Sequence, residues 1–198
     1  MRRIVCGLGN PGPDYAGTRH NVGFAVLDHF ARREGLLFES PAVLEGFTGP
    51  RQFVCARVRD ALCVKPLTFM NRSGVVLAPI VRWAGVEPAD VLVVYDDLDL
   101  PFSALRIRPH GGHGGHNGVR SILEHLGTER FPRLRVGIGN PRTDAARHVL
   151  DRFTPAEEED IAISVAEAAD AVLAWLECGD IELVMTRFHS RWNQGSAP

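Results

Sequence analysis

Short apolar runs alternate with longer amphipathic stretches along the whole chain. Seven runs have the length and the Val, Ile, Leu and Phe content typical of β-strands: RRIVCGL (residues 2–8), VLEGFT (43–48), QFVCARV (52–58), ALCVKP (61–66), VLVVYD (91–96), ALRIR (104–108) and LRVGIG (134–139). VLVVYD is apolar almost throughout, which predicts a central strand covered on both faces.

Five stretches between or after these runs are predicted to be helical: residues 22–33, 73–83, 118–127, 155–178 and 181–191. We expect Asn21 to cap the first helix and Gly35 to end it. The fourth has the strongest start signal, since Thr154 and Glu157 have the spacing of a capping box. Helix boundaries are therefore well marked in this sequence.

Strands that alternate with helices predict an α/β fold, with a mixed, mostly parallel central sheet flanked by helices on both sides. The β-rich stretch from residue 43 to residue 65 is expected to supply an antiparallel portion. The chain shows no internal repeat, low-complexity tract or linker. Its 198 residues suit a single domain, residues 1–198, with a substantial core.

Several polar residues follow strands of the predicted sheet directly. Asn10 follows the first strand, Asp96 ends the strand VLVVYD, and ALCVKP leads to Asn71. In open α/β sheets, ligands bind beyond the carboxyl ends of the strands. If the first strand and VLVVYD are parallel neighbours, Asn10 and Asp96 emerge at the same edge. The loop that carries His20 starts from that edge as well.

Composition places the chain among ordinary globular proteins. Its apolar fraction of 45% and charged fraction of 23% are typical of that class. No apolar run has the length of a membrane span, and the first residues lack the pattern of a signal peptide. None of the four cysteines forms a C-x-x-C pair, and three lie in apolar runs. They indicate reduced core cysteines and a cytoplasmic location.

The net charge of −2 gives no global attraction to nucleic acid. The charge is uneven, however, because arginines are concentrated in one region: Arg106, Arg108, Arg120, Arg130, Arg133 and Arg135. A local basic face and a solvated surface of mixed charge both fit this pattern.

The segment LGNPGPDYAGTRHN, residues 8–21, contains the main candidate for catalysis. Its prolines and glycines are suited to a stiff loop that holds side chains in place. His20 can act as a base at neutral pH, and Asp96 could accept a hydrogen bond from one of its ring nitrogens. No nucleophile motif such as G-x-S-x-G accompanies the pair. A His–Asp pair without a nucleophile indicates a base that activates water.

Asn10, Asn71 and Asn117 form a second set of candidates. Each amide offers a donor and an acceptor together, which suits recognition of a peptide backbone or of a carbonyl oxygen that becomes negative. The alternative is that each asparagine serves only as a turn or cap residue.

The run Gly7-Leu8-Gly9-Asn10-Pro11-Gly12 matches the dinucleotide-binding pattern G-x-G-x-x-G. That fingerprint requires a helix that begins within the glycine loop, so that its amides face the pyrophosphate. Here Pro11 and Pro13 remove amide donors, and the helix is expected only from about residue 22. We therefore reject the dinucleotide interpretation.

Two groups of residues in the sequence could in principle bind a metal ion. His110, His113 and His116 recur every three residues, and Asp96, Asp97 and Asp99 lie close together in the sequence. The glycines between the histidines fit a flexible loop, and the spacing matches no common zinc pattern. No functional metal is expected.

Five segments resemble the motifs of bacterial peptidyl-tRNA hydrolases: GLGNPGPDYAGTRHNVG, KPLTFMNRSG, YDDLDLP, GGHGGHNG and FPRLRVGIGNP. They occur in the family's order and spacing, and they cover the chain from its first strand to about Pro141. The resemblance implies a monomeric α/β hydrolase that cleaves the ester between a peptide and the terminal ribose of tRNA. It implies no cofactor, and it implies that the enzyme recycles tRNA from stalled translation.

The resemblance also implies roles for individual residues. His20 matches the catalytic base, Asp96 the acid that keeps His20 basic, and Asn10 the residue that helps to exclude aminoacyl-tRNA with a free amino group. Tyr15, Phe69, Asn71 and Asn117 match substrate-contacting positions, with Met70 beside them, and Arg108 and Arg135 match positions that grip the tRNA 5′-phosphate. After Pro141 the resemblance is loose, and Arg142 and Arg147 remain alternatives for further contacts with tRNA.

Three other functions stay open at this stage. A non-catalytic RNA-binding module on the same fold would keep its biological activity without His20. A different water-activating hydrolase would cleave small acyl esters and would not depend on the 5′-phosphate. A nucleotide-binding protein would be stabilised by a dinucleotide.

Overall fold

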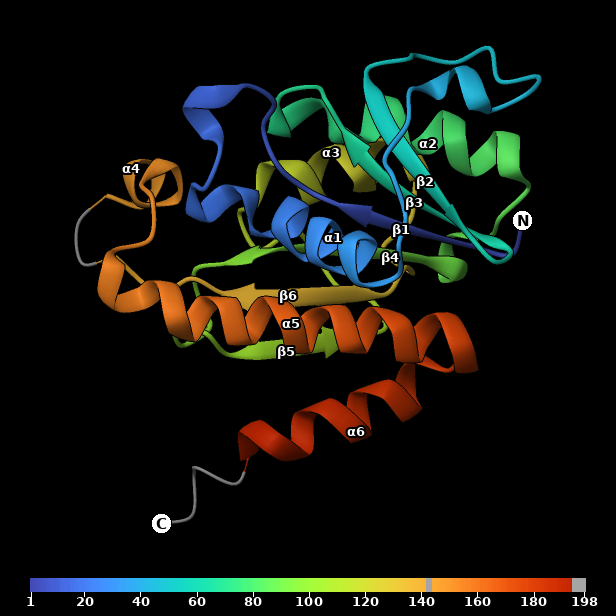
Figure 1. Cartoon of the computed structure of the whole chain (residues 1–198). Coiled ribbons are helices and arrows are strands. Elements are labelled where there is room, and N and C mark those ends of the chain that lie inside the picture. The colour runs from blue at the N-terminus through green and yellow to red at the C-terminus, as the bar shows by residue number, and fades with distance from the viewer. Residues whose placement is uncertain (142–143, 194–198) are drawn as a thin grey trace.

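The computed structural model describes residues 1–141 and 144–193, and in them all six strands join one sheet (Figure 1). The strands are β1 (Arg3–Gly7), β2 (Phe53–Val58), β3 (Ala61–Pro66), β4 (Val91–Asp97), β5 (Leu105–Arg108) and β6 (Arg133–Gly137), in the order β2-β3-β1-β4-β6-β5. The four inner strands are parallel, and the edge strands β2 and β5 run antiparallel to their neighbours. This confirms the mixed, mostly parallel sheet.

Helices cover both faces of the sheet (Figure 1). The main ones are α1 (Val22–Arg33), α2 (Ser73–Ala84), α3 (Asn117–Leu126), α4 (Ala145–Leu150), α5 (Pro155–Cys178) and α6 (Ile181–Asn193). Helices α1, α5 and α6 share one hydrophobic cluster with the sheet, while α2 and α3 share a second cluster with its other face. β4 is buried along its full length between the two layers, as its apolar sequence predicts.

One prediction about local structure is wrong, and one helix was not predicted. The run at residues 43–48 is not a strand: a 3₁₀ turn, Pro41–Val43, leads into turns in which Leu44 and Phe47 are buried. Its apolar residues serve core packing without a strand pairing. Helix α4 was not predicted, because none of its residues is buried and it therefore carries no apolar stripe.

The end signals of the helices are largely confirmed. Thr154 and Glu157 form the predicted capping box of α5, and Gly179 ends that helix in the left-handed conformation. Asn21 precedes α1 as expected, but its side chain does not cap the helix. It bonds instead to the backbone of Asn10, which ties the start of the helix to the loop after β1.

The four cysteines are free, and three of them are buried, as predicted. Burial raises the pKa of the Cys63 thiol to about 12, so this thiol stays protonated and unreactive. No helix in the described part of the chain is both long and apolar enough to cross a membrane.

Gly23 allows α1 to approach the carboxyl ends of β1 and β4 very closely. A Cβ atom at this position would lie 2.3 Å from the carbonyl oxygen of Val94 and 2.6 Å from backbone atoms of Leu8. Both neighbours are backbone atoms, one within β4 and the other directly after β1, so neither can move aside cheaply. The first turn of α1 is therefore set directly on the sheet, immediately after His20.

We predict that Gly23→Ala lowers the free energy of unfolding by roughly 1–3 kcal/mol, because the added methyl group overpacks a rigid contact. Urea unfolding measures this loss. Ala25→Ser, at an exposed position of the same helix, is the control and should change stability by less than about 0.5 kcal/mol. Equal stability of Gly23→Ala and the native chain would contradict the close contact.

Candidate active site

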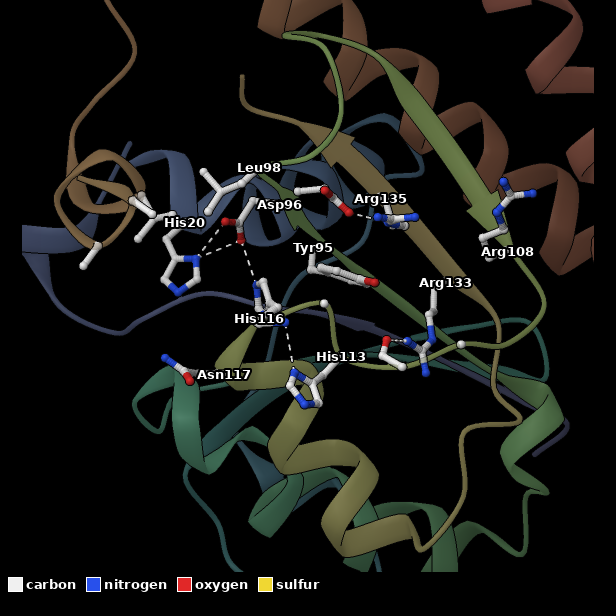
Figure 2. A pocket seen from close by; sticks show the side chains of 18 of the residues that line it. His20, Tyr95, Asp96, Leu98, Arg108, His113, His116, Asn117, Arg133 and Arg135 are labelled. Atoms are coloured by element: carbon white, nitrogen blue, oxygen red, sulfur yellow. Dashed lines mark hydrogen bonds and ion pairs between the residues drawn. The ribbon is translucent and has the colours of Figure 1, made fainter. Parts of the chain in front are cut away.

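His20 and Asp96 meet at the carboxyl edge of the sheet (Figure 2). Asp96 is near the end of β4, and His20 is in a 3₁₀ turn, Arg19–Asn21, directly before α1. The Nδ1 atom of His20 lies 2.9 Å from each carboxylate oxygen of Asp96. Both residues are buried, with exposed fractions of 8% and 2%. Because β1 and β4 are parallel neighbours, the expected convergence at this edge is confirmed.

A second histidine contacts the same carboxylate. The Nε2 atom of His116, from the loop before α3, lies 3.0 Å from Oδ1 of Asp96. Its Nδ1 atom accepts hydrogen bonds from the backbone N–H groups of Gly118 and Val119, at 3.1 and 3.2 Å. An atom that accepts these bonds carries no proton. The proton of the neutral ring is therefore on Nε2, which donates to Asp96.

Sequence reasoning missed His116 as a partner of Asp96. From the sequence, this histidine is only one of three regularly spaced histidines that could bind a metal ion. Its place directly before the amphipathic helix α3 was a signal for part of this role, because a side chain at the N-cap position can accept hydrogen bonds from the first turn of the helix. Its contact with Asp96, 20 residues away, depends on the sheet topology.

These contacts define which ring nitrogen of neutral His20 carries the proton. Burial by itself would raise the pKa of the Asp96 carboxyl, but the neighbouring His116 and His20 outweigh burial and hold that pKa well below its usual range. An ionised carboxylate only accepts hydrogen bonds, so Nδ1 of His20 is the donor. The Nε2 atom of His20 then carries the free lone pair, and the ring lines the adjacent cavity.

That cavity has a volume of about 590 Å³. His20, Asp96 and the glycine-rich loop before α3 form one wall, and residues of α4 form another. Arginines from the adjacent strands β5 and β6, Arg108, Arg133 and Arg135, line the far end (Figure 2). A basic imidazole at one end and guanidinium groups at the other suit a substrate that carries phosphate.

The metal interpretation gains no support from this geometry. Of the three spaced histidines, only His116 contacts Asp96; Nδ1 of His113 accepts from a backbone N–H, and His110 is exposed. His20, Asp96 and His116 form a group of suitable size for an ion. However, a metal on Nε2 of His116 would require a proton on Nδ1, where two backbone N–H groups already point. Asp97 is engaged by Arg135.

Asn10 is held in a defined orientation by three hydrogen bonds. Its backbone N–H and C=O both bond to the side chain of Asn21, and its Oδ1 atom accepts from the backbone N–H of Met70 at 2.8 Å. The side-chain oxygen is therefore occupied, and the Nδ2 amide has no hydrogen-bond partner within the described residues. Asn10 presents a donor.

The remaining candidates differ in exposure. Asn71 and Asn117 are exposed, at the starts of two helical turns, and Asn117 lines the cavity. The rings of Tyr15 and Phe69 contact edge to face, with centroids 6.1 Å apart. Met70 is 4% exposed and packs in the core, so its contribution to this region is the backbone bond to Asn10.

The predicted basic residues also occupy different environments. Arg108 is exposed on β5, whereas Arg135 on β6 is paired with Asp97. Arg147 is exposed on α4. Arg142 lies outside the described residues.

Arg19, next to His20, fastens the loop to α5. Its guanidinium is buried and donates to Oε2 of Glu157 at 2.7 Å, and it lies 4.9 Å from the ring centre of Phe153. Glu157 also closes the capping box with Thr154. The hydrogen bond from Arg19, together with the bonds from Thr154, lowers the pKa of Glu157 to about 2 against the cost of burial. One carboxylate thus joins the His20 loop to α5.

Two of the three glycines of the rejected dinucleotide motif, Gly7 and Gly9, serve packing. A Cβ atom on Gly9 would lie 2.7 Å from the ring of Phe24, and one on Gly7 would lie 2.4 Å from the carbonyl oxygen of Gly23. The helix starts only at Val22, as expected. The backbone amides of the loop therefore do not form a pyrophosphate cradle at a helix start.

Comparison with known proteins gives one consistent result. The model of the family described as peptidyl-tRNA hydrolase matches residues 4–196. A peptidyl-tRNA hydrolase of Synechococcus sp. (strain JA-3-3Ab) is 45% identical over 189 residues, which cover 94% of this chain and 82% of that protein. One of Chloroflexus aurantiacus is 46% identical over 193 residues, covering 94% and 98%.

Solved structures agree with the sequence relatives. The crystal structure of peptidyl-tRNA hydrolase from Acinetobacter baumannii has a TM-score of 0.84 and 31% identity, and the match covers 94% of this chain and 93% of that one.

We predict that Glu157→Gln lowers the free energy of unfolding by roughly 1–2 kcal/mol at pH 7, because the charged hydrogen bonds to Arg19 and Thr154 are lost. Since folding lowers the pKa of Glu157 from 4.5 to about 2, its stabilisation is complete above about pH 4.5 and is lost as the pH falls toward 2. Urea unfolding at pH 7 and pH 3 should show the difference from the native chain shrinking at pH 3.

Glu158→Gln is the matched control, since Glu158 lies in the same helical turn but is exposed. It should cost less than about 0.5 kcal/mol at either pH. Equal losses in the two variants would mean that only the helix dipole is involved, and would contradict the link to Arg19.

Proposed function

The chain belongs to the peptidyl-tRNA hydrolase family, and from that premise we propose that His20, oriented by Asp96, is the general base with which it cleaves its substrate. It is a hydrolase that acts on the ester bond of peptidyl-tRNA. One observation carries the mechanism: Nδ1 of His20 is bonded to a buried carboxylate, which leaves Nε2 unprotonated beside the cavity.

The reaction begins when Nε2 of His20 accepts a proton from water. The water oxygen attacks the carbonyl carbon of the ester, and negative charge develops on the carbonyl oxygen. Asp96 stabilises the imidazolium that has formed, as the acid does in other His–Asp pairs. The tetrahedral intermediate then collapses, and the imidazolium returns its proton to the departing ribose oxygen. The products are tRNA and the free peptide, whose new carboxylic acid group loses its proton to solvent.

His116 supports this chemistry indirectly. Its Nε2–H donates to the Asp96 oxygen that also receives His20, while its Nδ1 is fixed by the first turn of α3. It therefore helps to keep the carboxylate ionised and aimed at His20. It is a positioning residue, because the lone pair on its Nδ1 atom already accepts hydrogen bonds from Gly118 and Val119 and is not available to a water molecule.

Asn10, Asn71 and Asn117 are suited to the peptide part of the substrate. Peptide sequences vary, so contacts to backbone groups are the appropriate means of recognition. The Nδ2 donor of Asn10 fits a carbonyl oxygen of the substrate, and Met70 keeps that donor facing outward. An acylated substrate is favoured over aminoacyl-tRNA with a free amino group. Tyr15 and Phe69 offer an aromatic surface nearby.

Arg108 and Arg135 are proposed to hold the tRNA 5′-phosphate. Phosphate contacts position a nucleic acid without reading its sequence, which suits an enzyme that accepts many tRNAs. We further propose that the chain acts as a monomer, as one domain over residues 1–198, in the cytoplasm, and that it recycles tRNA from stalled translation.

The principal test is release of labelled N-acetyl-amino acid from N-acetyl-aminoacyl-tRNA. We predict that His20→Ala and Asp96→Asn each lower kcat by roughly 10²–10⁴-fold, since one removes the base and the other no longer fixes the tautomer of His20. Aminoacyl-tRNA with a free amino group should be cleaved far more slowly by the native enzyme.

Asp99→Asn is the control, because Asp99 is exposed two residues after Asp97 and should leave the rate unchanged. A fully active His20→Ala variant would remove His20 as the base. Absence of native activity with tRNA binding retained would instead support the non-catalytic RNA-binding module.

A further inference from the structure

The edge strand β5 and its neighbour β6 place four arginines on one face of the sheet. In the register of β5 and β6, Arg106 lies opposite Arg135, and Arg108 lies opposite Arg133. Alternation along each strand and opposition across the pair put all four side chains on the same side. The other side carries Leu105, Ile107, Leu134 and Val136, which pack in the cluster that includes α5 and α6. We call the first side the arginine face.

This arrangement is unfavourable for the free protein. Like charges placed directly opposite in a sheet are destabilising, and here two such pairs are adjacent. Arg135 is neutralised by Asp97. Arg133 is 2% exposed and donates to backbone carbonyls of Gly112 and Glu129. These contacts leave an excess of positive charge on the face.

Arg106 and Arg108 carry that excess. Both side chains are exposed, and neither guanidinium group has a hydrogen bond or ion pair to the residues that the structure describes. They are two residues apart on an edge strand, so their backbones are about 7 Å apart. Two unpaired guanidinium groups at this spacing form an anion-binding surface that folding does not require.

The face is continuous with the active site. In the sheet register, Arg135 on β6 pairs with Tyr95 on β4, the residue directly before Asp96. Arg106 on β5 pairs with Arg135. Arg106 therefore lies about two strand spacings, roughly 10 Å, from the row of Tyr95. Arg133 and Arg135 line the cavity that contains His20. An anion on this face can thus belong to the molecule whose ester lies at His20.

We propose that Arg106 binds a backbone phosphate of the tRNA acceptor stem other than the 5′-terminal phosphate. The proposal rests on the proposed function, in which Arg108 and Arg135 hold the terminal phosphate. That phosphate carries at most about two negative charges, whereas the four arginines and Asp97 leave a net charge of about +3. The surplus matches a second phosphate, and RNA supplies one along the same strand.

The first experiment measures the affinity of N-acetyl-aminoacyl-tRNA for the inactive His20→Ala enzyme as a function of salt. Adding Arg106→Gln should weaken binding several-fold at low salt and reduce the slope of log K against log salt by about 0.7–0.9, the loss of one phosphate contact. Arg57→Gln, an exposed arginine on β2 at the opposite edge of the sheet, is the matched control and should change neither quantity. An unchanged slope in Arg106→Gln would overturn the proposal.

The second experiment repeats the titration with tRNA that has a 5′-hydroxyl group. The effect of Arg108→Gln should disappear, because its phosphate is absent, whereas the effect of Arg106→Gln should persist. If both effects disappear, Arg106 binds the terminal phosphate and the proposal is wrong.

Two further measurements separate this proposal from other failures. Arg106→Gln should have a Tm at low ionic strength equal to or above that of the native chain, because a repulsive pair is removed; a lower Tm would show a structural role and overturn the proposal. Hydrolysis by the native enzyme tests the proposed function independently. If the native enzyme hydrolyses its substrate but Arg106→Gln binds tRNA as tightly as before, only the proposed role of Arg106 is refuted. If the native enzyme does not hydrolyse the substrate, the proposed function is refuted.

Discussion

The site depends on one buried carboxylate shared by two imidazoles. Asp96 is near the end of the central strand, where burial strongly disfavours a charge. Hydrogen bonds from His20 and His116 compensate for that cost and keep the carboxylate ionised. In turn, the carboxylate decides which nitrogen of His20 carries the proton. In the proposed mechanism, this electrostatic compensation inside the fold is what makes His20 a base beside the cavity.

This arrangement requires that separate segments be held precisely. The loop after β1 is tied to α1 through Asn10 and Asn21, and to α5 through Arg19 and Glu157. Gly23 sets the first turn of α1 directly on the sheet. His20 lies between these attachments, so its ring is positioned by contacts on both sides. Such rigidity is expected where a catalytic group must keep its orientation without help from the substrate.

Charge is organised locally in this enzyme. The net charge of −2 gives little long-range attraction to RNA. The arginine face concentrates positive charge where an acceptor stem would reach the ester, while acidic residues begin α5 on the other side of the sheet. If the arginine face binds tRNA as proposed, a local patch of this kind would favour correct placement of the tRNA and permit release after hydrolysis.

The sequence by itself determined the layers of the fold and most element boundaries, because apolar period and capping residues act over a few neighbouring positions. It also indicated His20 and Asp96, since both belong to short motifs beside predicted strand ends. It did not reveal α4, which buries no side chain, or the true partner of Asn21. The contact of His116 with Asp96 and the opposition of four arginines were decided only by the tertiary structure. Both depend on strand order and register, which arise from packing between residues far apart in the chain and leave no local signal.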